Sequence, residues 1–328
     1  MPARCLVRGS INIDEFFQVK DIVRPGETVS SDHLVKRPGG KGANQAVAVA
    51  RAGAIVDLVG AVGRDGLWVR DELKEAGVGV ESVSIAEENI GRAIIQVTEL
   101  GENSIILFKG ANYATLPAHA IHPDTTHIAL QNEIPLPHTI DYLARASSSS
   151  SKISTIFNPS PMPTAAELKA LPWHQLTWLI VNSGEALNLC TALNLEVPPM
   201  SASASASVVD TATPLLLRLA AYMPTTNVVC TLGADGVLAK FILPGASEAV
   251  YLPAAKLQGT TRDTTGAGDC FTGYMVAGLM RLDAQKKATV EEYTSVLRRC
   301  AQAAGMCVEK RGALASIPFG EDVDARLS

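Results

Sequence analysis

Short apolar segments alternate with longer helical patterns along the chain, and this alternation constrains the fold more than any other feature. Each apolar segment is rich in β-branched residues and closed by Gly, Pro or Asn, which predicts a strand. The predicted strands are residues 5–9, 55–62, 126–131, 154–159, 177–182 and 227–233. The predicted helices are residues 41–53, 66–76, 135–146, 209–222, 267–282 and 289–308. Such alternation predicts an α/β fold with a parallel sheet covered by helices on both faces.

Two segments interrupt this alternation. Residues 15–36 and 91–109 read as strands without intervening helices. Strands without helices between them do not fit the strand–helix alternation of the predicted parallel sheet. We therefore expect them to form a small β appendage that projects from the main sheet and acts as a lid.

Composition excludes several classes of protein. The 328 residues carry 33 acidic and 28 basic side chains, a formal charge of −5. With no block of Lys or Arg, this balance argues against a nucleic-acid partner. No run of about 18 apolar residues predicts a membrane helix, and residues 1–14 do not look like a signal peptide. The six scattered cysteines, without a CxxC pair, are typical of reduced thiols. We expect a cytoplasmic protein without a membrane partner.

The segment DTTGAGD at 263–269 is the strongest chemical signal in the chain. Gly266 and Gly268 let the backbone approach an anion closely, and a helix that begins near Ala267 would direct free N–H groups toward it. Asp269 would then lie in the first helical turn, beside the bound phosphate. A carboxylate at that place suits a general base that deprotonates an attacking hydroxyl. The alternative is a Gly-rich turn with Asp269 as a simple helix-start charge.

A second Gly-rich segment, RPGGKGANQA at 37–46, precedes an Ala/Val-rich helix. It is not a Walker A loop, because Gly42 follows Lys41 where Ser or Thr is needed, and it lacks the GxGxxG of dinucleotide-binding folds. Gly40 would let the backbone approach a polyol, while Lys41 and Asn44 would donate hydrogen bonds. A tight connection between strand and helix would give the same pattern.

Polar residues follow several predicted strands. Asn12 and Asp14 alternate after the first strand, so both side chains point to one side of an extended segment, where they could grip neighbouring hydroxyls. Glu133, and later Asn182 and Glu185, follow two further strands and would reach the same edge of a parallel sheet. An acidic residue near transferred phosphates commonly acts through Mg²⁺ and its waters. Asn and Asp are also common in turns.

Together these segments resemble the ribokinase-like (phosphofructokinase-B type) carbohydrate kinase family. The segments that carry the resemblance occur in the family's order over nearly the whole chain: GSINID, PGE, GGKGANQA, GAN, NSGE, TLGADG and DTTGAGD. The resemblance implies one domain over residues 1–328, a three-layer α/β sandwich with a mostly parallel central sheet, and a β-sheet lid from about 15–36 and 91–109. It also implies phosphorylation of the 5-hydroxyl of D-ribose by ATP, with Mg²⁺ and an activating K⁺.

The same resemblance implies roles for single residues. Asp269 would activate the hydroxyl, and the amides of Gly266, Ala267 and Gly268 would form an anion hole. The sugar would contact Asn12, Asp14, Gly40, Lys41, Asn44, Glu133 and Asp269. ATP would contact Asn182, Thr231, Gly233, Gly236 and Gly268. Glu185 would organise Mg²⁺ through water. The monovalent cation would lie near Asp263, Thr265, Cys307, Lys310, Gly312 and Ser316, partly through backbone carbonyls.

Three places depart from the family pattern. Pro38 before Gly39 is unusual but suits a turn from strand to loop. Arg8 stands in the first strand, where a hydrophobic residue is usual, and its charge needs a partner or solvent. Cys300–Ala301–Gln302 stands where the family often has an Asn near the adenine. The adenine contact, and with it the preference for ATP over other nucleotides, is therefore left open by the sequence.

Other functions compete with ribose phosphorylation. A relative that phosphorylates another sugar or a nucleoside is one, although aromatic residues make up only 5% of the chain and few could stack a base. Phe16, Phe17 and Phe108 on the expected lid keep that alternative open. A catalytically silent sugar-binding regulator would be expected to lose the base, whereas Asp269 is present. Lid edges that pair with a second subunit, as bacterial members of the family suggest, would give a homodimer.

Overall fold

The main element of the computed structural model is a nine-stranded sheet, and the structure describes residues 3–98, 102–197, 207–243, 246, 248–285 and 289–328. The strand order is β13-β12-β11-β10-β9-β8-β1-β4-β5. In that order the strands are Val250–Leu252, Val237–Lys240, Asn227–Thr231, Trp178–Asn182, Ser154–Phe157, Thr125–Leu130, Arg4–Arg8, Ile55–Gly63 and Val83–Ala86. Neighbours from β11 to β5 are parallel, and β12 and β13 add an antiparallel edge. The predicted mostly parallel sheet is confirmed.

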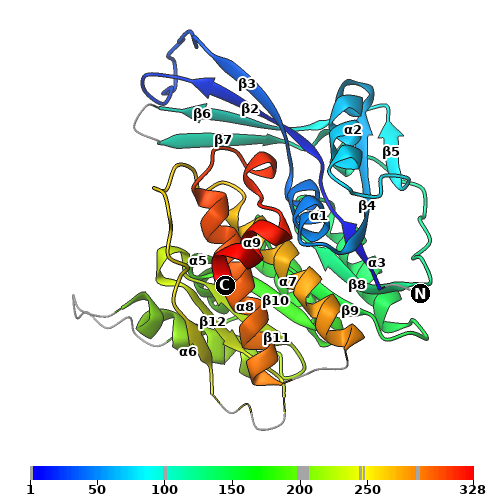
Figure 1. The fold of residues 1–328 in the computed structure, drawn as a ribbon. Coiled ribbons are helices and arrows are strands. Elements are labelled where there is room, and N and C mark those ends of the chain that lie inside the picture. Colours follow the sequence, from blue (N-terminus) through cyan, green and yellow to red (C-terminus); the bar gives the residue numbers. More distant parts are fainter. Residues whose placement is uncertain (1–2, 99–101, 198–206, 244–245, 247, 286–288) are drawn as a thin grey trace.

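Helices cover both faces of this sheet (Figure 1). They are α1 (Lys41–Arg51), α2 (Leu67–Glu75), α3 (Leu136–Ser147), α4 (Ala165–Ala170), α5 (Ser183–Ala192), α6 (Val208–Tyr222), α7 (Ala267–Ala284), α8 (Val290–Val308) and α9 (Gly320–Leu327). One buried apolar cluster joins α1, α2, α7, α8 and α9 to the sheet, and a second joins α3 to α6 to its other face. Within β1, Cys5 and Val7 belong to the first cluster and Leu6 to the second. The alternating directions of strand side chains explain this division.

The structure contains every predicted strand and helix, with ends that differ by a few residues at most. The prediction omitted β5, β12, β13, α4, α5 and α9. Most of these are very short, so hydrophobic periodicity has few residues in which to appear. Helix α5 has ten residues, but the sequence analysis interpreted its N-cap Asn182 and its first-turn residue Glu185 only as site residues.

A separate four-stranded sheet projects beyond one end of the main sheet (Figure 1). Its order is β3-β2-β6-β7, with β2 at Asn12–Gln18, β3 at Leu34–Gly39, β6 at Gly91–Val97 and β7 at Asn103–Phe108. The predicted β appendage is therefore present, although β2 begins before residue 15 and residues 99–101 lie outside the described residues. The prediction of strand over 15–36 is wrong for residues 19–33, which connect β2 to β3 without strand structure. Strand β2 pairs in parallel with β6, whereas β3 and β7 are antiparallel edge strands.

The register of the small sheet fixes which side chains share a face. Asp14 pairs with Arg37 on β3 and with Ala93 on β6, and Ala93 pairs with Leu107 on β7. Paired residues point to the same face of a sheet. We call the face that carries Asp14 the inner face and the opposite face the outer face.

Arg8 is buried in β1, with 2% of its surface exposed. Its Nη1 donates to the carbonyl oxygens of Gly9 and Val59 at 3.4 and 3.3 Å, and no carboxylate within the described residues pairs with it. Burial lowers the pKa of this guanidinium to about 10.

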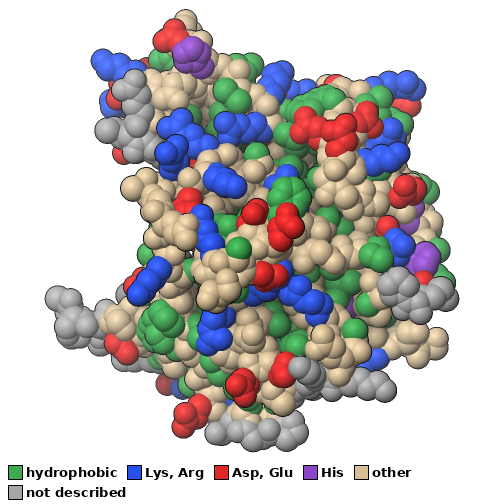
Figure 2. All heavy atoms as spheres, in the orientation of Figure 1, with side chains coloured by type: hydrophobic (Ala, Val, Ile, Leu, Met, Phe, Trp, Pro, Cys, Tyr) green, Lys and Arg blue, Asp and Glu red, His purple; other side chains and the backbone are tan. Residues whose placement is uncertain are grey.

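The described surface mixes both signs of charge. On the face drawn in Figure 2, basic side chains are most frequent over the small sheet and acidic side chains are interspersed among them. Within the described residues, no helix is both long enough and apolar enough to cross a membrane.

Candidate active site

Close backbone contacts bring the starts of α1 and α7 together beyond the end of β1. A Cβ on Gly42 of α1 would lie 2.6 Å from Gly9 Cα, so α1 rests directly on the chain that leaves β1. A Cβ on Gly273 of α7 would overlap with Ala48 of α1. Because neither glycine has a side chain, the polar residues on the first turns of both helices come within hydrogen-bonding distance.

Asp269 lies at this helix contact and is 5% exposed. Asn44 Nδ2 donates to its Oδ2, and Gln45 Nε2 donates to its Oδ1, each at 3.0 Å. Both carboxylate oxygens therefore have an amide donor from α1. The structure thus brings the predicted base and the predicted sugar ligand Asn44 into direct contact, although they are 225 positions apart in the sequence.

Asn12 and Asp14 lie on the inner face of the small sheet, at the start of β2, rather than at the end of β1. Asn112 Nδ2 donates to Asn12 Oδ1 at 2.6 Å, and Asn112 Oδ1 accepts from the amide of Ile11 at 2.8 Å. A Cβ on Gly91 would overlap with both asparagine side chains. The GAN segment therefore orients Asn12, a role that the sequence analysis did not assign to Asn112.

Glu133 holds the connection between β1 and α1. Its Oε2 accepts from Ser10 Oγ at 2.6 Å and from the amide of Lys41 at 3.0 Å. Gly40, just before Lys41, has a φ of 91°, a left-handed conformation that favours glycine. Glu133 thus fixes the first turn of α1, where two of the predicted sugar ligands lie.

Charges concentrate in this region. Burial opposes the charge on Lys41, but the carboxylates of Asp269, Glu133 and Glu185 outweigh it and raise the pKa of its ammonium group. Burial, helped by Glu133 and Asp269, raises the pKa of Asp14 to about 7. A site with several converging carboxylates and one lysine suits a ligand rich in hydroxyl groups, because carboxylates accept hydrogen bonds from hydroxyls.

The first turn of α7 has the form expected for an anion site. Gly266 caps the helix with a φ of 79°, and a Cβ there would lie 2.7 Å from Ala313 Cα. A Cβ on Gly268 would meet only open space. The amide of Ala267 donates to Thr264 O at 3.3 Å, whereas an amide one residue further into the first turn has no acceptor within the helix.

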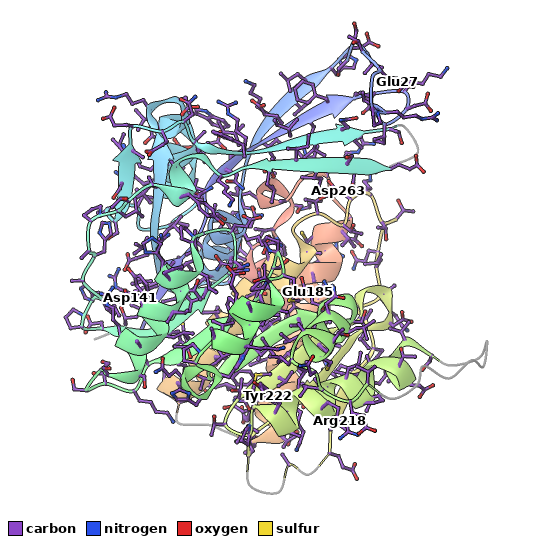
Figure 3. All side chains as sticks on the ribbon, turned by 180° about the vertical axis from the view of Figure 1, so that it is seen from behind. Glu27, Asp141, Glu185, Arg218, Tyr222 and Asp263 are labelled. Carbon is purple, nitrogen blue, oxygen red and sulfur yellow. The ribbon has the colours of Figure 1, made fainter. Side chains whose placement is uncertain are left out.

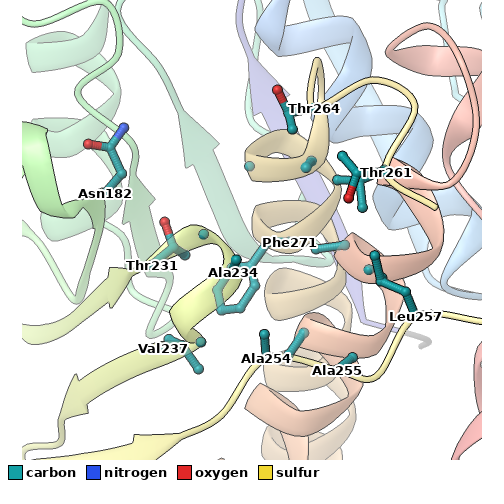
Figure 4. Close-up of a pocket in the computed structure, with 18 residues that line it drawn as sticks. Asn182, Thr231, Ala234, Val237, Ala254, Ala255, Leu257, Thr261, Thr264 and Phe271 are labelled. Atoms are coloured by element: carbon teal, nitrogen blue, oxygen red, sulfur yellow. The ribbon is translucent and has the colours of Figure 1, made fainter. Parts of the chain in front are cut away.

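A cavity of about 530 Å³ opens beside this turn (Figure 4). Every residue predicted to bind the nucleotide lines it, namely Asn182, Thr231, Gly233, Gly236 and Gly268. Figure 4 shows Asn182 and Thr264 toward one end and Val237, Ala254 and Ala255 at the other. The cavity therefore has a polar end near the start of α7 and an apolar end further along.

The segment 300–302 contributes only one side chain to this cavity. Ala301 lines it, whereas Cys300 and Gln302 are buried and are not part of its wall. Ala304, Gly305 and Val308 continue the same wall along α8. The apolar end thus offers surface for a flat ring and no side-chain hydrogen bond from this segment.

Asn182 and Glu185 form a reciprocal cap at the start of α5. Asn182 Oδ1 accepts from the amide of Glu185 at 2.8 Å, and Glu185 Oε2 accepts from the amide of Asn182 at 2.9 Å. Glu185 Oε1 accepts no hydrogen bond from the described residues. No group of three acidic, His or Cys side chains among them could hold a metal. A single carboxylate oxygen of this kind is able to accept a hydrogen bond from a water molecule on a metal ion.

Two loops meet where the monovalent cation was predicted. Asp263 Oδ1 accepts from the amide of Thr265 at 2.9 Å, and its Oδ2 accepts from the amide of Gly312 at 2.8 Å. Cys307 Sγ and Ser316 Oγ lie 2.8 Å apart, and the carbonyl of Cys307 accepts from the amide of Lys310. The predicted residues lie together, and Figure 3 shows Asp263 directly beneath the small sheet. The side chains of Cys307 and Ser316 contact one another.

The fold and this site define a carbohydrate kinase. The chain matches the model of the pfkB family carbohydrate kinases over residues 2–319 and belongs to that family. The predicted family resemblance is thus confirmed. An enzyme that transfers a phosphoryl group must hold its two substrates side by side. In this structure the polar cluster around Asp269 is adjacent to the cavity that Gly268 lines.

Individual relatives in this family are ribokinases. The Bacillus subtilis ribokinase is 31% identical over 99% of both chains, and the Schizosaccharomyces pombe ribokinase is 30% identical over 98% of this chain and 97% of its own. A ribokinase structure from Cryptococcus neoformans in complex with ADP has a TM-score of 0.89 and 48% identity over 99% of both chains. An Arabidopsis thaliana ribokinase complexed with ribose and ATP has a TM-score of 0.81 and 25% identity, covering 100% of this chain and 99% of its own.

Proposed function

We propose that this protein is a ribokinase, which transfers the γ-phosphoryl group of ATP to the 5-hydroxyl of D-ribose. The observation that carries the proposal is the position of Asp269 between the two halves of the site. Its carboxylate binds Asn44 in the polar cluster, and the adjacent Gly268 lines the nucleotide cavity. The ribokinases solved with ADP and with ribose and ATP share this fold.

The proposed reaction is a direct in-line transfer without a phosphoenzyme. Asp14, Asn44 and Glu133 bind the sugar hydroxyls in the company of Asn12, Gly40 and Lys41. Asp269 accepts the proton of the 5-hydroxyl as that oxygen attacks the γ-phosphorus, and the bond from this phosphorus to the β,γ-bridging oxygen breaks to release ADP. The amides around Gly266–Gly268 stabilise the charge that develops on the transferred group, because the start of a helix attracts anions.

We further propose that the small sheet is a lid that closes over the sugar. Its inner face carries Asp14 and several apolar residues that the described part of the chain leaves about half exposed. Val35, Ile105 and Leu107 on that face are 43%, 53% and 47% exposed. Closure would bury them and exclude water, which limits hydrolysis of ATP. Phe16 shares this face, whereas the register turns Phe17 and Phe108 outward, so two of the three lid phenylalanines cannot stack a bound base.

Two ions belong to the proposal. Glu185 would contact nucleotide-bound Mg²⁺ through water, and Mg²⁺ would neutralise phosphate charge. K⁺ would bind at carbonyl oxygens between the loop at Asp263 and the loop at Gly312, which the structure joins by a hydrogen bond. We also place the enzyme in the cytoplasm, because all six cysteines are free and buried, as in proteins of a reducing compartment.

The outer face of the small sheet supports a homodimer. Ile106 and Phe108, at 58% and 49% exposure, lie on this face of β7, and no strand of the described residues pairs with the outer edge of β7. An exposed apolar edge strand is a surface that a second copy can cover.

Replacing Ile106 with Lys should convert the dimer to a monomer, because the charge would be buried in the interface. Analytical ultracentrifugation at several concentrations measures this change. Ile85→Lys is the matched control, since Ile85 is 51% exposed but lies on β5 of the large sheet. A wild type that sediments as a monomer, or an Ile106→Lys variant that stays dimeric, would contradict the proposed interface.

A coupled assay with Mg²⁺ and ATP tests the activity. We expect the highest turnover on D-ribose, compared with D-fructose, 2-deoxyribose and adenosine, and we expect potassium to raise it. Adding GTP as an alternative donor shows whether the apolar end of the cavity selects the base.

Turnover only on another acceptor would keep the role of Asp269 and overturn the proposed sugar. Turnover unaffected by potassium would remove the cation from the proposal. Binding of ribose without turnover would favour a silent sugar-binding regulator.

A further inference from the structure

We propose that Gln45, supported by Gln131, positions the carboxylate of Asp269 for proton transfer. The inference rests on the proposed role of Asp269 as the base. Gln131 Nε2 donates to Gln45 Oε1 at 2.6 Å, and Gln45 Nε2 donates to Asp269 Oδ1 at 3.0 Å. Both glutamines have no exposed surface. Since ligands cannot reach them, they act on the reaction only through Asp269.

The direction of this hydrogen-bonded chain follows from the charge of Asp269. An ionised carboxylate only accepts hydrogen bonds, so Gln45 must present its NH₂ group to Asp269 and its carbonyl oxygen to Gln131. Gln131 must therefore donate through its Nε2, and its own Oε1 accepts no hydrogen bond from the described residues. A buried acceptor without a partner is costly and uncommon. The Oε1 of Gln131, unpartnered within the described residues, thus lowers stability locally, while the two glutamine amides hold the Asp269 carboxylate in place.

The side-chain amides of Asn44 and Gln45 restrain rotation of the Asp269 carboxylate. The terminal torsion of an aspartate has a broad, soft preference, so packing alone fixes it poorly. Asn44 and Gln45 are consecutive on α1 and bind opposite oxygens of the carboxylate. Asn44, with 4% of its surface exposed, is the member of the pair that a sugar can reach, and its Oδ1 accepts no hydrogen bond from the described residues. Gln45 has no such free atom, and it is the fully buried member of the pair.

The side chain of Gln131 is held in a space beside Gly9. It directly follows β8, and a Cβ on Gly9 would overlap with its Oε1. Gly9 follows β1, the strand next to β8. The side chain of Gln131 therefore occupies space that exists only because residue 9 is glycine, which anchors the far end of the chain of amides to the central sheet.

The test compares Gln45→Leu, Gln131→Leu and the double variant, with kcat, KM and ribose affinity by calorimetry. We expect Gln45→Leu to lower kcat by about 10- to 100-fold, the range for a misplaced reacting group. Ribose affinity should change by less than about threefold, because a group that affects only the reaction step leaves substrate binding intact. Gln131→Leu should have a smaller effect on kcat, and the double variant should match Gln45→Leu, since Gln131 acts only through Gln45.

Thermal unfolding separates positioning from a merely structural role. Gln45→Leu leaves the buried Nε2 of Gln131 without an acceptor, and the double variant removes that group, so the double variant should be the more stable of the two. If kcat recovers together with stability in the double variant, or if ribose affinity falls as much as kcat, the inference is wrong. Gln285→Leu, at the exposed far end of α7, is the control and should change nothing.

The same experiment distinguishes this inference from the proposed function. The wild type is assayed first, and the variants are then measured with whichever acceptor it phosphorylates. A wild type that prefers another sugar would overturn the ribose proposal, whereas the kcat pattern of the glutamine variants would still decide the positioning role. A wild type that transfers no phosphoryl group to any acceptor would overturn both.

Discussion

Replacing Asp269 with Asn should lower kcat by about 10²- to 10⁴-fold, the contribution of a positioned general base. Asparagine has nearly the same shape but cannot accept the proton of the sugar hydroxyl at neutral pH. Ribose affinity should stay nearly intact, because the introduced amide can still exchange hydrogen bonds with Asn44 and Gln45 after those side chains rotate. Steady-state kinetics and ribose calorimetry on the same preparation measure both quantities.

An exposed acid on a remote helix provides the control. Asp322→Asn, in the first turn of α9, should leave kcat and ribose affinity unchanged. An Asp269→Asn variant that keeps more than about a tenth of wild-type kcat has lost at most ~1.4 kcal/mol of transition-state stabilisation. That result would show that Asp269 is not the base.

Replacing Asp14 with Ala or Asn should weaken ribose binding. Replacing it with Asn should also stabilise the ligand-free protein. Burial, with Glu133 and Asp269 nearby, raises the pKa of Asp14 to about 7, so the folded protein resists its ionisation. We expect Asp14→Ala and Asp14→Asn each to weaken ribose binding by about 10- to 100-fold, because a hydrogen bond to a charged group is worth roughly 1.5–3 kcal/mol. Calorimetry with ribose measures the loss.

The stability effect has a definite pH dependence. The folded state keeps a proton that the unfolded state releases near the ordinary pKa of 3.8, so stability falls as pH rises from about 4 to about 7. Asp14→Asn removes this cost, and we expect a gain of roughly 1–4 kcal/mol in the free energy of unfolding at pH 8 and little at pH 4. Asp71→Asn, with 65% of its side chain exposed, is the control. Unchanged ribose affinity, or equal stability changes at both pH values, would contradict the assignment.

The parallel sheet and most of its helices could be predicted because each leaves a pattern in neighbouring residues of the sequence. The alternation of apolar segments and helical patterns specifies the parallel sheet, and Gly266 before Asp269 marks the start of α7. The parallel strands also explain why Glu133 reaches the site, since carboxyl ends of neighbouring strands meet at one edge. Roles for the sugar, nucleotide and cation residues remain predictions that the kinetics above will test.

Other parts of the site depend on distant contacts that leave no local pattern. Gln45 and Gln131 look like ordinary polar residues until α1 and β8 bring them together. Asn112 lies in a motif, but its hydrogen bond to Asn12 depends on the missing side chain of Gly91. Arg8 appears in the sequence as a charge that needs a partner, whereas the structure buries it against two carbonyls. Glu185 has a structural role as a helix cap beside its predicted one, which its position after a strand does not reveal.

The 225 positions between Asn44 and Asp269 have a consequence for the newly made protein. A ribosome extends a chain by about 5–20 residues per second, so the residues of the small sheet and the first turn of α1 emerge well before α7 is made. During that interval the growing chain has most of its proposed sugar ligands and no base. Catalytic activity can therefore begin only late in synthesis, after α7 has been made and has packed against α1.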